Sequence, residues 1–80
     1  MANEHNIIIY STPTCPYCHQ AKRYLAERGF DFTDKDVATD LQAREDMIRK
    51  SGQLGVPVID VDGNIIIGFN RPKLDELLAE

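Results

Sequence analysis

The chain has 80 residues and a mass of 9.1 kDa, so we expect one small domain over residues 1–80. Hydrophobic residues make up 42% of it and charged residues 28%, which is the balance of a globular protein and not of a disordered one. Thirteen acidic against nine basic residues give a net charge of −4. This charge argues against a nucleic-acid partner, because such binding neutralises phosphates with Lys and Arg.

Membrane insertion and secretion are also not expected. No apolar run approaches the roughly 20 residues that a membrane helix needs, and the start, MANEHN, is polar and acidic rather than basic and then apolar. The only cysteines, Cys15 and Cys18, are too close in sequence to join distant parts of the fold. This excludes a structural disulfide framework and favours a cytoplasmic location.

The first predicted elements are a strand and a helix. Residues 6–10, NIIIY, form a short apolar, β-branched run that predicts a buried strand. After a turn, Pro16 suits the first position of a helix. Three apolar residues then recur at helical spacing, namely Cys18, Ala21 and Leu25. They predict an amphipathic helix of roughly three to four turns, which ends at Gly29 with the next residue packed on its last turn.

A second strand is predicted near 30–36, where Phe30 and Phe32 alternate with polar residues. The order strand, helix, strand is a βαβ unit, whose strands lie parallel. Thr39 and Gln42 resemble a capping box, which predicts a second helix over about 40–51, ended by Gly52. Its expected apolar contributors are Leu41, Ala43, Met47 and Ile48.

The last third of the chain has the pattern of a hairpin followed by a helix. β-Branched runs around residues 58–61 and 65–67 flank Asp62-Gly63-Asn64, a strong signal for an antiparallel hairpin. Asn70 or Arg71 precedes Pro72 at a helix start, and the inward stripe of this helix would be Leu74, Leu77 and Leu78. The whole order predicts an α/β fold with a mixed four-stranded sheet covered by helices.

The motif Cys15-Pro16-Tyr17-Cys18 lies where the first strand passes into the first helix, the context of a thioredoxin-like redox site. Unpaired N–H groups and the dipole at a helix N-terminus stabilise a thiolate and lower its pKa from about 8.5 to roughly 3.5–7.5. We expect Cys15 to be exposed and to gain this effect, and Cys18 to face inward. Attack by the outer thiolate and resolution by the inner thiol follow from that asymmetry.

Two other interpretations of the cysteines remain open. They could be a buried pair that only packs, or half of a zinc site, because C-x-x-C is also metal-ligand spacing. A closed zinc site needs four ligands, and the only other soft candidates are His5 and His19. His19 would point away from a shared centre, and His5 has no spacing pattern.

The segment Gly55-Val56-Pro57-Val58-Ile59 also has two interpretations. A proline that opens a strand needs no further role, since it cannot donate to the ladder. Alternatively, a cis Pro57 would leave the backbone polar groups of Val56 free for an extended peptide. Spacing alone does not distinguish them.

Several other polar residues are most simply structural. Tyr10 and Tyr24 are expected to pack or to lie half-buried at the surface. We expect Asp31, Asp34 and Asp36 to form a solvated edge. Lys22 and Arg23 would raise the local positive potential near the cysteines, but a solvated helix face is the simpler explanation.

Three segments, in this order, resemble the glutaredoxin family: IIIYSTPTCPYCHQAKRYL, GVPVI and GNIIIGFNRPKLDELL. The resemblance covers nearly the whole chain. It implies a thioredoxin-like fold with sheet order 2-1-3-4, in which three helices are distributed over the two faces of the sheet. It also implies a dithiol oxidoreductase that reduces protein disulfides and glutathione mixed disulfides.

The resemblance also implies roles for single residues. Cys15 would be the nucleophile and Cys18 the resolving thiol, and the two would form the redox-active disulfide. Tyr17 would flank the bound thiol, Pro57 would be the cis proline, and Val56 would offer backbone hydrogen bonds to the cysteine part of glutathione.

The chain departs from the family pattern in two places. Many glutaredoxins carry Lys where this chain has Thr12, and Gly-x-Asp-Asp where it has Gly68-Phe69-Asn70-Arg71. Gly68 matches, the acids are absent, and Arg71 could instead take a glutathione carboxylate. The Gly-Phe-x-x-Pro segment resembles the glutaredoxin-like hydrogen donors of ribonucleotide reductase, which thioredoxin reductase recharges.

The implied partners follow from these resemblances. We expect glutathione as a co-substrate, disulfide-bearing proteins as substrates, no tightly bound cofactor or metal, and a monomer. The alternative is a redoxin that thioredoxin reductase recharges and that donates electrons to ribonucleotide reductase or a similar enzyme. A third candidate, from a different class, is a metal or iron–sulfur carrier in which Cys15 anchors a cluster between two copies.

Overall fold

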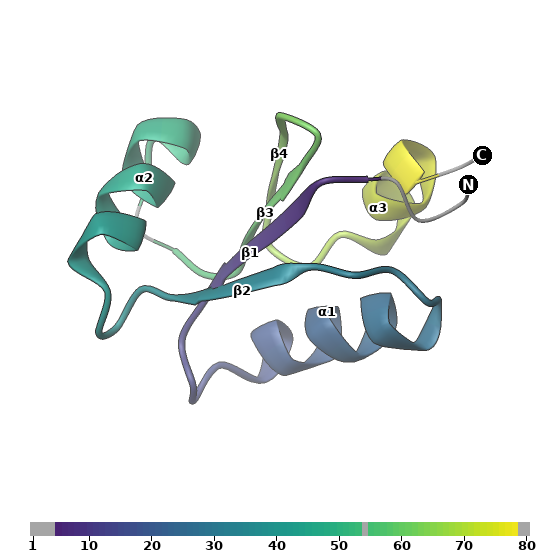
Figure 1. Ribbon diagram of the computed structural model, residues 1–80, viewed down its shortest axis with the longest axis horizontal. Coiled ribbons are helices and arrows are strands. Elements are labelled where there is room, and N and C mark those ends of the chain that lie inside the picture. The colour runs from purple at the N-terminus through teal and green to yellow at the C-terminus, as the bar shows by residue number, and fades with distance from the viewer. Residues whose placement is uncertain (1–4, 54, 79–80) are drawn as a thin grey trace.

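The computed structural model describes residues 5–53 and 55–78. Residues 1–4, part of the start in which no signal sequence is expected, lie outside this description. The elements in chain order are β1 (Ile7–Ser11), α1 (Pro16–Glu27), β2 (Thr33–Asp36), α2 (Leu41–Ser51), β3 (Val58–Val61), β4 (Asn64–Ile67) and α3 (Arg71–Leu78) (Figure 1). The strands form one sheet in the order β2-β1-β3-β4. Strands β1 and β2 are parallel and the other two pairings are antiparallel, which confirms the predicted mixed sheet.

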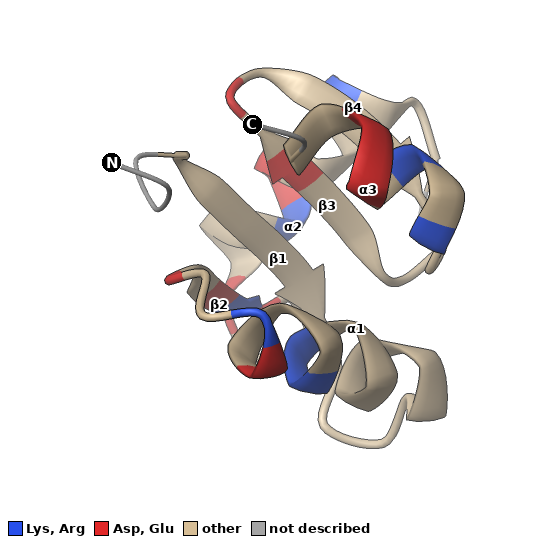
Figure 2. Ribbon diagram, turned by 90° about the vertical axis from the view of Figure 1, so that its right-hand side faces the viewer, with Lys and Arg blue, Asp and Glu red and all other residues tan. Residues whose placement is uncertain are grey.

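Helices α1 and α3 cover one face of the sheet, and α2 covers the other (Figure 2). Alternate residues of a strand point to opposite faces, so the two faces have separate cores. The buried residues between the sheet and α1 and α3 are Ile7, Ile9, Ala21, Leu25, Phe30, Ile59, Val61, Ile66, Leu74 and Leu78. Under α2 the buried residues are fewer: Tyr10, Val37, Ala43, Met47 and Val58.

Helix α1 begins and ends as the sequence predicts. Cys15 is its N-cap and Pro16 its first residue. At the other end, Gly29 has a φ of +81°, which favours glycine, and Phe30 donates its N–H to the carbonyl of Leu25 at 3.0 Å. Phe30 is buried beside Leu25 in the core, so the chain turns back toward the sheet directly after the helix ends.

The hairpin and α3 also follow the predictions. Asp62 and Gly63 both have positive φ, 54° and 92°, and connect β3 to β4 as a two-residue turn. Asn70, not Arg71, caps α3, because its Oδ1 accepts the N–H of Lys73 at 3.2 Å.

Three predictions need correction. The second strand spans only Thr33–Asp36, because Phe30 already belongs to the turn that closes α1. The α2 cap is Asp40 and not Thr39, since the Asp40 Oδ1 accepts the N–H of Ala43 at 3.1 Å.

The third correction concerns the buried face of α2. Leu41 is 69% exposed and Ile48 is 38% exposed, so only Ala43 and Met47 of the four predicted residues are buried. A single helix on this face of the sheet leaves the flanking positions in solvent. No helix within the described ranges is long and apolar enough to cross a membrane.

Candidate active site

Cys15 sits at the N-terminus of α1, directly after the turn that follows β1. Its backbone is extended, with φ −90° and ψ 114°, and its Sγ accepts the N–H of Cys18 at 3.4 Å. A side chain in this N-cap position satisfies one of the free N–H groups of the first turn. The structure therefore places the Cys15 sulfur where the helix N-terminus stabilises negative charge, as predicted.

The two thiols differ in burial. Cys18 is completely buried, on the same face of α1 as Ala21 and Leu25, which confirms its inward orientation. Cys15 is half-buried, whereas the sequence analysis predicts an exposed side chain. Its Sγ lies 3.9 Å from the carbonyl oxygen of Val56, so the segment before β3 covers one side of it.

The environments of the thiols move their pKa values in opposite directions. Partial burial alone would raise the pKa of the Cys15 thiol, but hydrogen bonds from Cys18 and from the backbone N–H of Tyr17 outweigh this, so the pKa lies below its ordinary value of 9.0. Burial, together with the hydrogen bond to Cys15, raises the pKa of Cys18 to about 11. Cys15 therefore forms a thiolate at a lower pH than Cys18 does.

Lys22 contributes positive charge on the β2 side of α1. Its Nζ donates to Asp34 Oδ2 at 2.9 Å, and the buried Ser11 donates to Asp34 Oδ1 at 2.7 Å. The charge of Lys22 further lowers the pKa of Cys15. Asp34 is exposed on the edge strand β2, which agrees with the predicted solvated edge, but it also forms an ion pair with Lys22, which lies 12 residues earlier in the chain. The alternative in which Lys22 raises the positive potential near the cysteines agrees with its effect on the pKa of Cys15.

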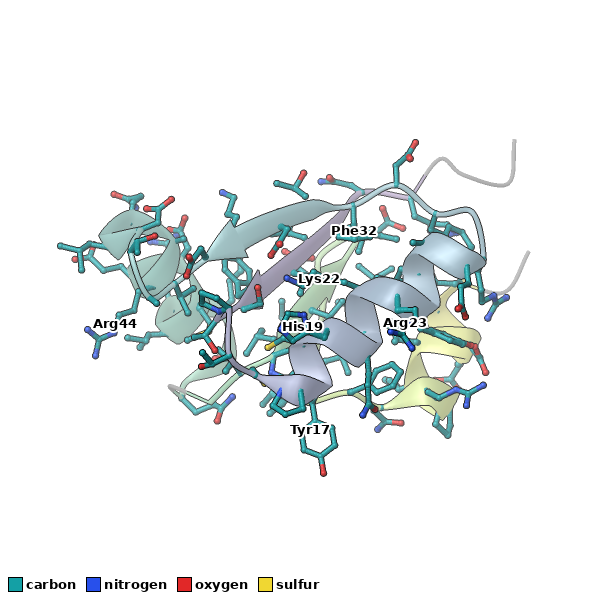
Figure 3. The ribbon with its side chains drawn as sticks, turned by 90° about the horizontal axis from the view of Figure 1, so that it is seen from below. Tyr17, His19, Lys22, Arg23, Phe32 and Arg44 are labelled. Atoms are coloured by element: carbon teal, nitrogen blue, oxygen red, sulfur yellow. The ribbon has the colours of Figure 1, made fainter. Side chains whose placement is uncertain are left out.

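His19 holds the turn before Cys15, a role that the sequence analysis missed. Its Nε2 donates to the carbonyl oxygen of Pro13 at 2.7 Å, while its backbone N–H donates to the carbonyl of Cys15 at 3.2 Å. Figure 3 shows His19 and Lys22 on the side of α1 next to this turn. The spacing of four residues from Cys15 was the only available signal, and it does not identify a carbonyl partner in an irregular turn.

The segment before β3 completes the site. The Val56–Pro57 peptide is cis, which agrees with the second interpretation of this motif and with the family resemblance. Gly68, with φ +82°, donates its N–H to the carbonyl of Pro57 at 2.8 Å. Hydrogen bonds thus connect the Cys15 turn, the Val56–Pro57 segment and the end of β4 into one surface.

The other predicted binding residues lie around this surface at different depths. Tyr17 is 61% exposed and projects away from the body of the molecule (Figure 3). Arg71 is exposed, and its guanidinium lies over the ring of Tyr24, with Cζ 4.8 Å from the ring centroid. Tyr24 is half-buried, as expected, and packs edge-on against Phe69.

Metal-ligand side chains do not gather around the two cysteines in the part of the chain that the structure describes. Within residues 5–53 and 55–78, no three His, Cys, Asp or Glu side chains lie together as a metal site would require. His5 lies instead at the hairpin turn, with Nδ1 2.6 Å from Asp62 Oδ2.

Comparison with known proteins agrees with this geometry. Residues 7–66 match the family model for glutaredoxin. An uncharacterized glutaredoxin-like 8.6 kDa protein in a rubredoxin operon of Clostridium pasteurianum is 54% identical over 74 residues, covering 92% of this chain and 99% of that protein. Glutaredoxin 3 of Escherichia coli K12 is 41% identical, covering 91% of this chain and 96% of its own length.

A solved structure is similar over the same length. The glutaredoxin-like protein NrdH-redoxin of Escherichia coli, which is described as having a thioredoxin-like activity profile, has a TM-score of 0.80 and 32% sequence identity. The match covers 90% of this chain and 93% of that one. Taken with the paired thiols at the start of α1, these matches show that the chain is a thioredoxin-like redox protein and belongs to the glutaredoxin family.

Proposed function

We propose that this protein reduces disulfide bonds in other proteins and mixed disulfides of glutathione, in a reducing cytoplasm and as a monomer. The observation that carries the proposal is the contrast between the two thiols at the start of α1. Cys15 is accessible with a lowered pKa, and Cys18 is buried with a pKa of about 11. This contrast separates an attacking sulfur from a resolving one.

The reaction proceeds in two exchanges. The Cys15 thiolate attacks one sulfur of the substrate disulfide, forms a mixed disulfide, and releases the other sulfur as a thiolate that takes up a proton. Cys18 then gives up its proton and attacks Cys15 Sγ, which releases the second substrate thiol. Two electrons and two protons pass to the substrate, and the protein is left with a Cys15–Cys18 disulfide.

Glutathione is our first candidate for the reductant that restores the dithiol. Its cysteine part would meet the backbone of Val56 beside Pro57 and Tyr17, with Gly68 at the far side. Arg71 supports this proposal, because it is exposed and forms no ion pair with a described residue. Its guanidinium would receive a glutathione carboxylate, and two glutathione thiols would become one glutathione disulfide per cycle.

A dithiol flavoprotein such as thioredoxin reductase is the second candidate, and three observations favour it. Thr12 provides no cation in the turn before Cys15, and the Asn70 side chain is used to cap α3. The relative with 32% identity is described as having a thioredoxin-like activity profile. In that case ribonucleotide reductase or a similar enzyme would be the electron acceptor.

The two thiols can be tested by single replacements. We expect Cys15→Ser to abolish reduction of every disulfide, because no other thiolate lies at the helix N-terminus. Cys18→Ser should stop the reduction of protein disulfides, which needs both thiols. It should still release glutathione from mixed disulfides, since external glutathione can resolve the disulfide between Cys15 and glutathione. Equal losses of both activities in the two variants would contradict the assignment.

The reductant is tested by supplying either glutathione with glutathione reductase or thioredoxin reductase, each with NADPH. We expect weak but measurable turnover with glutathione. Arg71→Ala should reduce it further, without changing the rate at which Cys15 is alkylated, and the loss should shrink at high salt because exposed ion pairs are screened. Turnover with thioredoxin reductase alone would instead support the second candidate.

A further inference from the structure

Acidic residues are absent from the parts of the sequence that build the active site. The three longest stretches without Asp or Glu are 5–26, 47–59 and 63–74. They contain six of the nine basic residues, so their formal charge is +6, while the remaining residues have three bases and thirteen acids and a charge of −10. A chain with a net charge of −4 therefore has a strongly uneven charge distribution.

The fold brings these three stretches together around Cys15. The first contains Cys15 itself, and the second contains Val56, whose carbonyl oxygen lies 3.9 Å from its sulfur. The third contains Gly68, which donates to Pro57. Figure 2 shows the same separation on the ribbon. The only charged residues in the first turns of α1 and at the start of α3 are basic, while acidic residues lie in the later part of α3 and in the β3–β4 turn.

Two of the six bases are not neutralised. Four of them pair with acids from elsewhere in the chain: Lys22 with Asp34, Arg49 with Asp46, Lys50 with Asp60, and Lys73 with Glu76. Arg23 and Arg71, which we name the rim arginines, form no ion pair with any residue in 5–53 or 55–78, and both are exposed. Arg71 rests on Tyr24, the residue next to Arg23, so the rim arginines lie on adjoining parts of α1 and α3.

We propose that the preferred protein substrates carry acidic residues near the reactive cysteine, and that these residues dock on the rim arginines. The inference rests on the proposed reduction of protein disulfides and adds the chemical class of substrate. The positive charge of the rim arginines attracts an acidic substrate segment and repels a basic one. This attraction raises the association rate of acidic substrates more than their binding affinity.

The helix geometry also sets the spacing. Arg23 is eight residues after Cys15, or about 12 Å along the helix at about 1.5 Å per residue. An extended substrate segment advances about 3.3 Å per residue. The acidic residues should therefore lie about four residues from the substrate cysteine, on the side that runs along α1.

The test uses the reduced protein alone and three peptides of one length. Each peptide has a single cysteine in a mixed disulfide with 2-mercaptoethanol, a neutral thiol, and two Glu, two Gln or two Lys centred four residues from it. Versions with these residues before or after the cysteine reveal the orientation. Oxidation of the Cys15–Cys18 dithiol is followed by acid quench and mass spectrometry, and no glutathione is present.

We expect the Glu peptide in one orientation to react about fivefold faster than the Gln peptide at low ionic strength, and the Lys peptide to react more slowly. In Arg23→Glu and in Arg71→Glu, the ratio of Glu to Gln rates should fall to about one or below. Arg44→Glu makes the same change in charge on α2, at the opposite end of the molecule (Figure 3), and should keep the ratio. Salt at 0.5 M should remove the preference.

The possible failures are distinct. Equal rates for the three peptides, or a preference that survives both rim variants, would overturn the acidic-substrate inference and leave the reductase function intact. If none of the peptides oxidises the dithiol, the proposed function itself fails, and the inference fails with it.

Discussion

The two faces of the sheet are held together in different ways. Under α1 and α3 the larger core is a cluster of buried aliphatic and aromatic side chains. Under α2 the smaller core includes the fully buried Tyr10, whose hydroxyl accepts a hydrogen bond from Lys50 at 2.8 Å. The same ammonium donates to the buried Asp60 at 2.8 Å, and Asp60 also accepts the N–H of Gly63 at 2.7 Å.

This difference shows which part of the fold supports the redox centre. Cys18 lies on the buried side of α1, so apolar packing on that face keeps one thiol dry and the other at the helix end. The face under α2 instead uses an ion pair and a buried tyrosine to attach its single helix. Substitutions on the two faces should therefore have different effects on the thiols.

The largest effect on stability is expected from Leu25→Ala. Leu25 is completely buried between α1 and the sheet, and its truncation should lower the free energy of unfolding by about 2–5 kcal/mol, from lost burial and a residual cavity. Because Leu25 shares a helix face with Cys18, alkylation of Cys18 should also become faster. Urea unfolding and timed alkylation measure the two effects.

Two controls sharpen this prediction. Met47→Ala, which truncates a buried residue under α2, should lower stability without changing the reactivity of either thiol. Ile48→Ala, at a partly exposed position on the same helix, should change stability by less than about 1 kcal/mol. A change in Cys18 reactivity in Met47→Ala as large as in Leu25→Ala would contradict the separation of the faces.

A smaller loss is expected from Asp60→Ala, about 1–3 kcal/mol, because it leaves the Lys50 ammonium and the N–H of Gly63 without their shared acceptor. The pair of changes Lys50→Met and Asp60→Val should recover most of this loss, since no charge is then left half-buried. Lys73→Ala, which removes an exposed ion pair with Glu76, is the matched control and should have little effect. If Asp60→Ala is as mild as Lys73→Ala, the polar network does not stabilise this face.

The smallest effect concerns the pH at which Cys15 reacts. Its lowered pKa means that the thiolate forms as pH rises through a value below 9.0, so iodoacetamide should modify Cys15 rapidly where Cys18, with a pKa of about 11, is still protonated. Lys22→Met removes a nearby positive charge and should therefore shift the Cys15 profile to higher pH.

Lys35→Met on β2 is the control for this shift. It makes the same change in charge, but Lys35 is not among the main groups that lower the pKa of Cys15. A shift of equal size in both variants would indicate a general effect of net charge and not a role for Lys22. A single thiol population that titrates at 9.0 would contradict activation of Cys15 altogether.

Local patterns in the sequence determined most elements and the centre of the site. Strand β1, the amphipathic spacing of α1 and the turn at Asp62-Gly63 each depend on neighbouring residues, so a single sequence reveals them. The same is true of Cys15 as a helix N-cap, because the motif lies directly between a strand pattern and a helix pattern.

What the sequence by itself determined was thus the identity of the two thiols and the order of the elements that hold them. Only the tertiary structure decided the groups that tune and surround them, such as Asp34 beside Lys22, Asp60 beside Lys50, and Arg71 over Tyr24. These contacts join residues 10 to 47 positions apart, and sheet pairing and helix packing bring them together. A charged residue looks the same in a sequence whether it meets solvent or a partner, so its role is determined only when the chain has folded.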